Sequence, residues 1–322
     1  MQPTTTTQSQ ISAFVNPARI LVATDLTDGN YLVPHAVAQA KASGARVMLI
    51  HAVPPANAFP MPAGYAPYPD ERICERQVQL QLEGMARQIE QQGVSCEIFF
   101  QHGPAPEVIS YKVKSTRAMR LIMGSHGRGK LGQMVLGSVA NELLGNVDVP
   151  VFVVGPHACG TVATPRKILH PVSLTGDYKK SAEIAFDLAR LYKAQLTLLH
   201  VLDPDVEPTI SRERSLVWSE KALLALLANG IGLTVSVQAR AAYGNLVQEI
   251  LNAATQTNAD WIILGVDGGF HSLPFQNSNA YKVIAAASCP VLTVRHEPNK
   301  LKDNERTEEV HIEEVHFTAP IG

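Results

Sequence analysis

The chain has 322 residues, of which 27 are Lys or Arg and 29 are Asp or Glu, so its formal net charge at pH 7 is −2. This length favours two domains over one, and the balanced charge argues against nucleic acid as the main partner. No apolar run reaches the roughly 20 residues of a membrane span. The scattered cysteines form no C-x-x-C pair, and no signal peptide pattern is present, so we expect reduced thiols and a cytoplasmic location.

Short apolar segments recur in the same order in the two halves of the chain. The first half contains ARILVATDL (18–26), RVMLIHAV (46–53), RLIMGSHG (120–127) and VPVFVV (149–154). The second half contains RKILHPVSL (166–174), QLTLLHVL (195–202), WIILGVDG (261–268) and CPVLTV (289–294). A self-similarity of this length indicates two copies of one domain.

Helical patterns lie between these segments. Apolar residues recur with a helical period at 33, 36, 37 and 40, at 78, 82, 85 and 89, and at 185, 188, 189 and 192. Uninterrupted apolar strands such as ILVA and RLIMG are typical of a parallel sheet covered on both faces. We therefore predict an α/β protein of two tandem doubly wound domains, each a five-stranded parallel sheet with helices on both faces. Ligands then belong at the carboxyl ends of the strands.

The predicted segments of the chain are a flexible tail (1–16), a first domain (17–156), a linker (157–165), a second domain (166–296) and a polar C-terminal tail (297–322). A long Pro/Ala-rich loop follows the second strand. The last strand of each copy is apolar to its end, as an edge strand that needs a partner would be. We expect these two strands to pair, which makes the chain an internal pseudo-dimer, and a homodimer of chains is a further expectation.

The stretch MGSHGRGKLGQMVLGS (123–138) fits three phosphate-binding patterns. A P-loop needs Ser or Thr after its lysine, but Leu131 follows Lys130. A dinucleotide fingerprint must follow the first strand of its unit, and this stretch follows the fourth. In the third pattern, nine residues separate Gly127 from Gly137-Ser138, which begins a predicted helix. Glycine amides and a helix start then converge on one anion.

This third pattern, G-x2-G-x9-G-[ST], lies between a hydrophobic strand and a V-P-V-x-V-V strand, and it resembles the ATP-binding signature of the universal stress proteins. The resemblance covers about residues 17–295 as a tandem pair, and it implies the adenine nucleotide alpha hydrolase-like fold. It implies ATP in the first copy, with any Mg²⁺ carried on the phosphates. The predicted cofactor-binding residues are Thr24, Asp25, Ala52, Val53, Met123, Gly124, His126, Gly127, Arg128, Gly137, Ser138 and Val139.

The resemblance also implies a role for each part of this set. Asp25 matches the aspartate near the ribose, and Ala52 and Val53 match the backbone positions that meet adenine. The glycines and their neighbours match the positions around ribose and phosphates. From the residues alone, a strand-end carboxylate suits ribose hydroxyls, although a helix cap is an alternative role for Asp25.

The second copy departs from this pattern. Ser278-Asn279 stands where Gly-Ser is expected, and Ser173 stands at the position of Asp25. Asp267 replaces His126 and adds a negative charge. Because the ribose acceptor is lost and like charge is added near the phosphates, we predict that the second copy does not hold ATP in the same way.

The resemblance implies a nucleotide-dependent stress-response or regulatory protein that binds ATP in its first domain. A slow ATPase is one alternative, and a scaffold or carrier of a small apolar ligand in the second domain is another.

His51 and His200 occupy equivalent strand ends, so we expect the same packing role for both. The Met and Trp residues are expected in the core. His311 and His316, in the C-terminal tail, are five apart and do not fit a metal site.

Overall fold

The computed structural model describes residues 14–54, 71–125, 136–155, 158, 162–174, 179–206, 211–226, 235–267 and 278–296. The elements of the first half are β1 (Arg19–Ala23), α2 (Gly29–Ser43), β2 (Arg46–Val53), α3 (Glu71–Glu90), β3 (Cys96–His102), α4 (Ala105–Ser115), β4 (Arg120–Gly124), α5 (Ser138–Asn146) and β5 (Val151–Val154). The elements of the second half are β6 (Lys167–Pro171), α6 (Lys179–Tyr192), β7 (Gln195–Leu202), α7 (Arg212–Ala225), β8 (Val237–Tyr243), α8 (Leu246–Thr257), β9 (Trp261–Asp267), α9 (Asn279–Ala286) and β10 (Val291–His296). The predicted C-terminal tail, with His311 and His316, and most of the Pro/Ala-rich loop lie outside the described residues.

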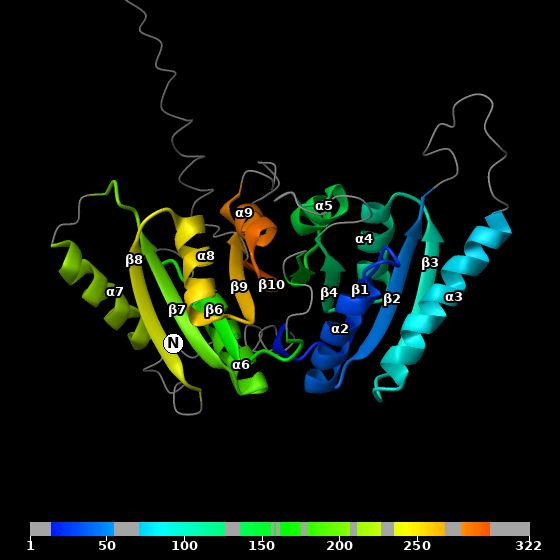
Figure 1. Ribbon diagram of the computed structural model, residues 1–322, viewed down its shortest axis with the longest axis horizontal. Helices are drawn as coiled ribbons and strands as arrows, with labels where there is room; N and C mark the ends of the chain where they lie inside the picture. Colours follow the sequence, from blue (N-terminus) through cyan, green and yellow to red (C-terminus); the bar gives the residue numbers. More distant parts are fainter. Residues whose placement is uncertain are drawn as a thin grey trace, which may run out of the picture.

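All ten strands belong to one sheet in the order β3-β2-β1-β4-β5-β10-β9-β6-β7-β8. Within each half the strands pair in parallel, and each half has the same order when read outward from the centre. Figure 1 shows β3 and β8 at the two ends of this sheet. The prediction of two doubly wound five-stranded units is confirmed.

The two halves meet through β5 and β10, which pair antiparallel with Phe152 opposite Leu292. This pair of strands is called the seam below. The prediction that the two terminal strands pair with each other is confirmed. Because each strand covers the open edge of the other, the two units become one continuous sheet.

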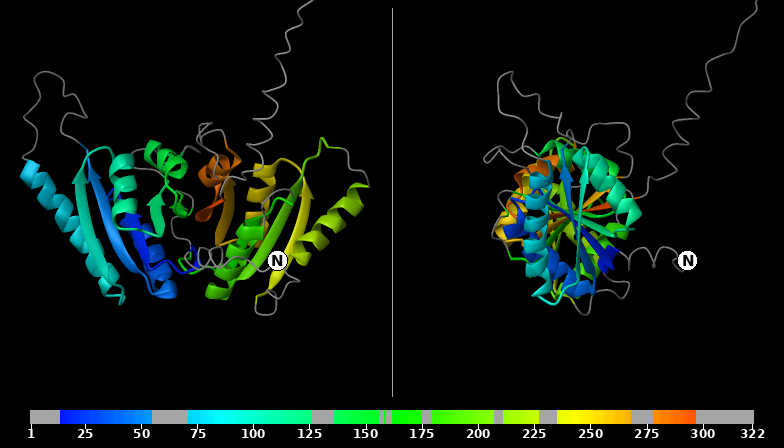
Figure 2. Two further views of the ribbon diagram at one scale, coloured as in Figure 1. Left: turned by 180° about the vertical axis from the view of Figure 1, so that it is seen from behind. Right: turned by 90° about the vertical axis from the view of Figure 1, so that its right-hand side faces the viewer.

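Helices cover both faces of the sheet, as predicted (Figure 2). Buried residues of α2, α3, α6 and α7 pack with the strand residues on one face of the sheet and form one core. Buried residues of α4, α5, α8 and α9 pack with the strand residues on the other face and form a second core. Ile20 and Val22 of β1 belong to the first core, and Leu21 and Ala23 belong to the second. This alternation follows from the two-residue period of a strand and explains the uninterrupted apolar runs.

The N-terminal end of the first half enters the core earlier than predicted. Val15 is buried, and the carbonyl of Phe14 accepts a hydrogen bond from the guanidinium of Arg120. Arg120 is itself buried, and it also donates to Gln39 Oε1 at 2.8 Å. A buried guanidinium needs acceptors, so residues 14 and 15 pack against the fold and are not part of a flexible tail.

The expectation that both tryptophans lie in the core is right for Trp261 and wrong for Trp218. Trp261 is fully buried, whereas Trp218 on α7 is 61% exposed. Helix α7 turns Ser215, Ser219 and Leu223 toward the protein interior. Since Trp218 lies beside Ser219 in the chain but on another face of the helix, it points outward.

Candidate functional site

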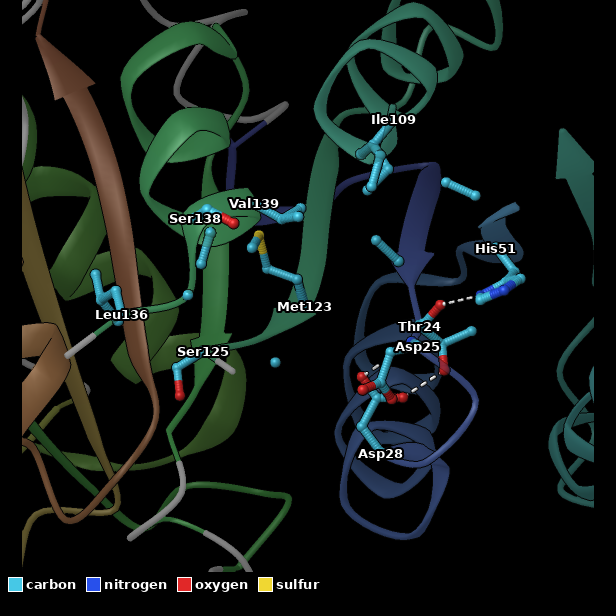
Figure 3. Close-up of a pocket in the computed structure, with 16 residues that line it drawn as sticks. Thr24, Asp25, Asp28, His51, Ile109, Met123, Ser125, Leu136, Ser138 and Val139 are labelled. Atoms are coloured by element: carbon cyan, nitrogen blue, oxygen red, sulfur yellow. Dashed lines mark hydrogen bonds between the residues drawn. The ribbon is translucent and has the colours of Figure 1, made fainter. Parts of the chain in front are cut away.

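A cavity of about 450 Å³ lies where β1, β2 and β4 end (Figure 3). In the order β3-β2-β1-β4-β5 the chain runs outward in one direction from β1 and then in the other from β4, so the cavity lies at the topological switch point. The lining residues are Ala23, Thr24, Asp25, Asp28, His51, Ala52, Ala105, Ile109, Met123, Gly124, Ser125, Leu136, Gly137, Ser138, Val139 and Ala140.

Most of the predicted cofactor-binding residues meet at this cavity. Those that line it are Thr24, Asp25, Ala52, Met123, Gly124, Gly137, Ser138 and Val139. Val53 is not among the described lining residues, and its carbonyl accepts a hydrogen bond from Gly103 N–H at 3.0 Å. His126, Gly127 and Arg128 lie outside the described residues.

The loop after β1 places the carboxylate of Asp25 at the cavity. Asp25 Oδ1 accepts hydrogen bonds from Thr27 N–H at 2.8 Å and from Thr27 Oγ1 at 2.7 Å. Asp25 Oδ2 is buried and has no hydrogen-bond partner within the part of the chain that the structure describes. Buried polar atoms are nearly always paired, so this oxygen is suited to accept a hydrogen bond from a ligand hydroxyl. The alternative role of Asp25 as a helix cap does not apply, because the N-cap of α2 is Asp28.

A second carboxyl, Asp28, also lines the cavity and was not found from the sequence. Its side chain accepts a hydrogen bond from Thr24 Oγ1, and it is only 3% exposed. Burial raises the pKa of Asp28 from 3.8 to about 6, with the hydrogen bond from Thr24 opposing the shift and the charge of Asp25 adding to it. The only sequence signal was its place just before α2, which is typical of a helix cap.

The histidine expectation is confirmed. His51 Nδ1–H donates to the carbonyl of Thr24 at 2.8 Å, and His200 Nδ1–H donates to the carbonyl of Val172 at 2.9 Å. Both side chains therefore tie the second strand of their repeat to the segment that follows the first strand. In the first repeat this bond helps to hold the wall of the cavity that contains Thr24 and Asp25.

The start of helix α5 lines the cavity, and its N-cap is a glycine, Gly137. Ser138 is its first residue, and among the described residues no side-chain cap hydrogen bond is made at this helix start. Gly137 N–H donates to the carbonyl of Ser125 at 2.8 Å. The following amides and the positive end of the helix dipole are therefore suited to an anion.

The remaining walls are mostly apolar. Ala105 and Ile109 come from α4, and Met123 and Val139 also line the cavity. Asp25 and Asp28 lie across the cavity from Ser138 (Figure 3). No Lys or Arg is among the described lining residues, so an anion there would meet amides and a hydroxyl. Three kinds of wall are therefore present: the apolar lining, the carboxylate of Asp25 and the start of α5. They fit a ligand that has a flat apolar group, a part with several hydroxyls and an anionic part.

The opposite pKa shifts of two buried groups give a prediction for stability against pH. Because Asp28 has a folded-state pKa raised from 3.8 to about 6, its contribution to the free energy of unfolding falls as the pH rises through that window. Burial lowers the pKa of His35 from 6.5 to about 4, so its contribution rises as the pH rises. Each changes the free energy of unfolding by about 1.4 kcal/mol per pH unit, and the two offset between pH 4 and 6.

Asp28→Asn removes one of these two contributions. The free energy of unfolding of the variant, relative to the wild type, is expected to increase by about 3 kcal/mol between pH 4 and pH 6. Urea unfolding at several pH values measures this difference. The exposed Asp205→Asn serves as the control and should show no such trend. A difference between Asp28→Asn and wild type that stays constant with pH would contradict the prediction.

Among the residues that the structure describes, no three or more His, Cys, Asp or Glu side chains are grouped so that they could hold a metal ion. Over the same part of the chain, no helix combines the length and apolar character needed to cross a membrane.

Comparisons with known proteins agree with the fold. A structure of a universal stress protein from Archaeoglobus fulgidus superposes with a TM-score of 0.65 at 20% identity, covering 86% of this chain and 96% of that one. A functionally unknown protein from Pseudomonas aeruginosa superposes with a TM-score of 0.64 at 17% identity, covering 93% and 99%. No curated protein sequence matches the chain significantly.

The family model named universal stress protein family matches the chain twice, over residues 17–155 and 164–295. These two matches include most of the chain and correspond to the two halves of the ten-stranded sheet. The predicted family is thus confirmed for both copies, and the chain belongs to the universal stress protein family as a tandem of two such domains.

Proposed function

We propose that the first repeat binds ATP in the cavity at the ends of β1, β2 and β4, and that the protein is a nucleotide-dependent regulator in the stress response. The observation that carries this proposal is the convergence of two incomplete groups on one cavity. Asp25 Oδ2 lacks a hydrogen-bond partner among the described residues, and the first turn of α5 lacks a side-chain cap. A ribose with attached phosphates supplies what each of them lacks.

The geometry suggests how the nucleotide lies. The ribose hydroxyls donate to Asp25, and the adenine lies against the apolar walls near Ala52 and Met123. The phosphates accept hydrogen bonds from the amides that begin α5 and from the hydroxyl of Ser138. Any Mg²⁺ would be carried on the phosphates.

The second repeat does not hold ATP in this way, because its corresponding helix start is already capped. Ser278 is the N-cap of α9, and its hydroxyl accepts a hydrogen bond from Tyr281 N–H at 3.0 Å. Ser173 stands where the first repeat has the carboxylate of Asp25. The second repeat therefore lacks both the uncapped helix start and the acceptor on which the proposal for the first repeat rests.

Calorimetry with ATP and mass spectrometry of the natively purified protein test this function. We expect heat of binding at one site per chain, or an adenine nucleotide already carried by the protein. Absence of both would overturn the proposal, and a lipid-like molecule in its place would favour the alternative of an apolar ligand carrier. ATP consumption measured on the same samples distinguishes a binder from an enzyme. We expect slow turnover at most, because the carboxylates of Asp25 and Asp28 lie across the cavity from Ser138, where the phosphates are proposed to bind (Figure 3).

Asp25→Asn tests the ribose contact. The substitution keeps an oxygen for the Thr27 hydrogen bonds but removes the charge, and a hydrogen bond to a charged group contributes about 1.5–3 kcal/mol. We expect ATP affinity to fall about 10- to 150-fold. Dideoxy-ATP, which lacks the ribose hydroxyls, should bind the variant and the wild type equally. Ser173→Ala at the matching position of the second repeat is the control. An equal loss for both nucleotides would show that Asp25 does not contact the sugar.

A further inference from the structure

A tyrosine of the second repeat reaches the wall of the cavity in the first repeat. Tyr281 belongs to α9, and its hydroxyl accepts a hydrogen bond from Leu136 N–H at 3.2 Å. Leu136 is buried and lines the cavity just before Gly137 and Ser138. Figure 3 shows Leu136 on the side of the cavity that faces the second half. This contact crosses the seam and joins residues 145 positions apart in the chain.

The two amides that precede the start of α5 are held by different parts of the molecule. Leu136 N–H donates to Tyr281 of the second repeat, and Gly137 N–H donates to the carbonyl of Ser125 at 2.8 Å. Ser125 is in turn held by its own N–H, which donates to the carbonyl of Val154 in the seam at 3.0 Å. The direction in which the chain enters α5 therefore depends on both repeats. That direction decides where the amides after Gly137 point.

Among the described residues, this contact is made only by the second repeat on the first. Tyr281 is the third residue of α9, and Ala140 is the third residue of α5. Counted from the start of each helix, Ala140 thus occupies the position of Tyr281 in the first repeat. Its side chain is a methyl group, so it cannot make the reciprocal contact. The repeat with the incomplete nucleotide motif supplies the longer side chain to the repeat with the complete motif.

We propose that Tyr281 is a positioning residue for the cavity of the first repeat, because its hydroxyl holds the backbone that leads into Gly137 and Ser138. The inference rests on the proposed function, since the ligand positioned by this backbone is the nucleotide. It assigns a role to the second repeat that does not require that repeat to bind ATP. The second repeat acts as a built-in partner whose α9 completes the phosphate side of the first site.

Tyr281→Phe removes the hydroxyl and keeps the ring. We expect ATP affinity to fall about 3- to 10-fold, as loss of one neutral hydrogen bond implies. We also expect hydrogen exchange at the Leu136 amide to become faster by a similar factor in protein without nucleotide. Tyr243→Phe is the matched control, because that hydroxyl is buried on β8 without a described hydrogen-bond partner. It should change neither readout.

The outcomes separate this inference from the proposed function. Failure of the wild type to bind ATP would overturn the proposed function and with it the positioning of a nucleotide, whereas the exchange rate at Leu136 would still report on the contact. Binding by the wild type with the same affinity in Tyr281→Phe would overturn only the inference. Unchanged exchange at Leu136 would do the same. A weaker affinity together with faster exchange, both absent in Tyr243→Phe, would support it.

Discussion

Ser138→Asp is expected to weaken ATP binding by at least about 100-fold without destabilising the protein. Ser138 is the first residue of α5 and lines the cavity. A carboxylate there would face the phosphates, and two unit charges about 4 Å apart near a protein surface repel by about 4 kcal/mol. The same carboxylate favours the helix itself by about 0.3–1 kcal/mol, because it lies at the positive end of the dipole.

Opposite effects on affinity and stability make this variant informative. Calorimetry measures the affinity, and urea unfolding without nucleotide measures the free energy of unfolding. Asn279→Asp, at the corresponding first residue of α9, is the matched control and should leave ATP affinity unchanged. If Ser138→Asp binds ATP as tightly as the wild type, the phosphates do not lie at the start of α5. A loss of stability would instead mean that the affinity result reflects unfolding.

Trp261→Ala is expected to lower the free energy of unfolding by about 3–5 kcal/mol, the range for an aromatic side chain removed from a core. Trp261 begins β9, is fully buried, and has the largest volume among the fully buried side chains described. Its ring packs edge-on against Phe152 in the seam at 4.8 Å and against Tyr192 of α6 at 5.0 Å between ring centroids. The substitution therefore removes contacts within the second half and contacts between the halves.

Two further tryptophan variants control for this effect. Trp261→Phe keeps an aromatic ring and removes an indole N–H that has no described hydrogen-bond partner, so it should cost less than half as much as Trp261→Ala. Trp218→Ala removes the exposed tryptophan and should stay within about 0.5 kcal/mol of the wild type. Denaturant unfolding followed by circular dichroism measures all three. Equal losses for Trp261→Ala and Trp218→Ala would contradict the assignment of Trp261 to the core between the halves.

The proposed function gives the two repeats different roles. Antiparallel pairing of β5 with β10 joins the two repeats edge to edge in one sheet. One repeat has the uncapped helix start and the carboxylate, and the other has a capped helix start and a tyrosine that reaches across. Loss of the motif in the second repeat is compatible with a retained function, because support of the first site depends on Tyr281 and not on the glycines.

Much of the fold could be predicted from the sequence because its signals are local. Parallel strands covered on two faces could be predicted from the apolar runs, from the helical periods and from the internal repeat of the sequence. The structure confirms this architecture. The glycine spacing placed Gly124, Gly137 and Ser138 at one cavity for the same reason. A strand end and a helix start are local features, and a doubly wound topology brings them to the same edge of the sheet.

What remained was decided by contacts between segments far apart in the chain. The burial that raises the pKa of Asp28, the reach of Tyr281 to Leu136, and the exposure of Trp218 depend on how whole elements pack. No periodicity encodes these, because a helix with apolar residues on several faces does not specify which face meets the sheet. The sequence thus determined the elements, their order and the candidate nucleotide motif. The tertiary structure alone decided which carboxyl is buried beside the cavity and how one repeat supports the other, because both follow from packing across the seam and the sheet.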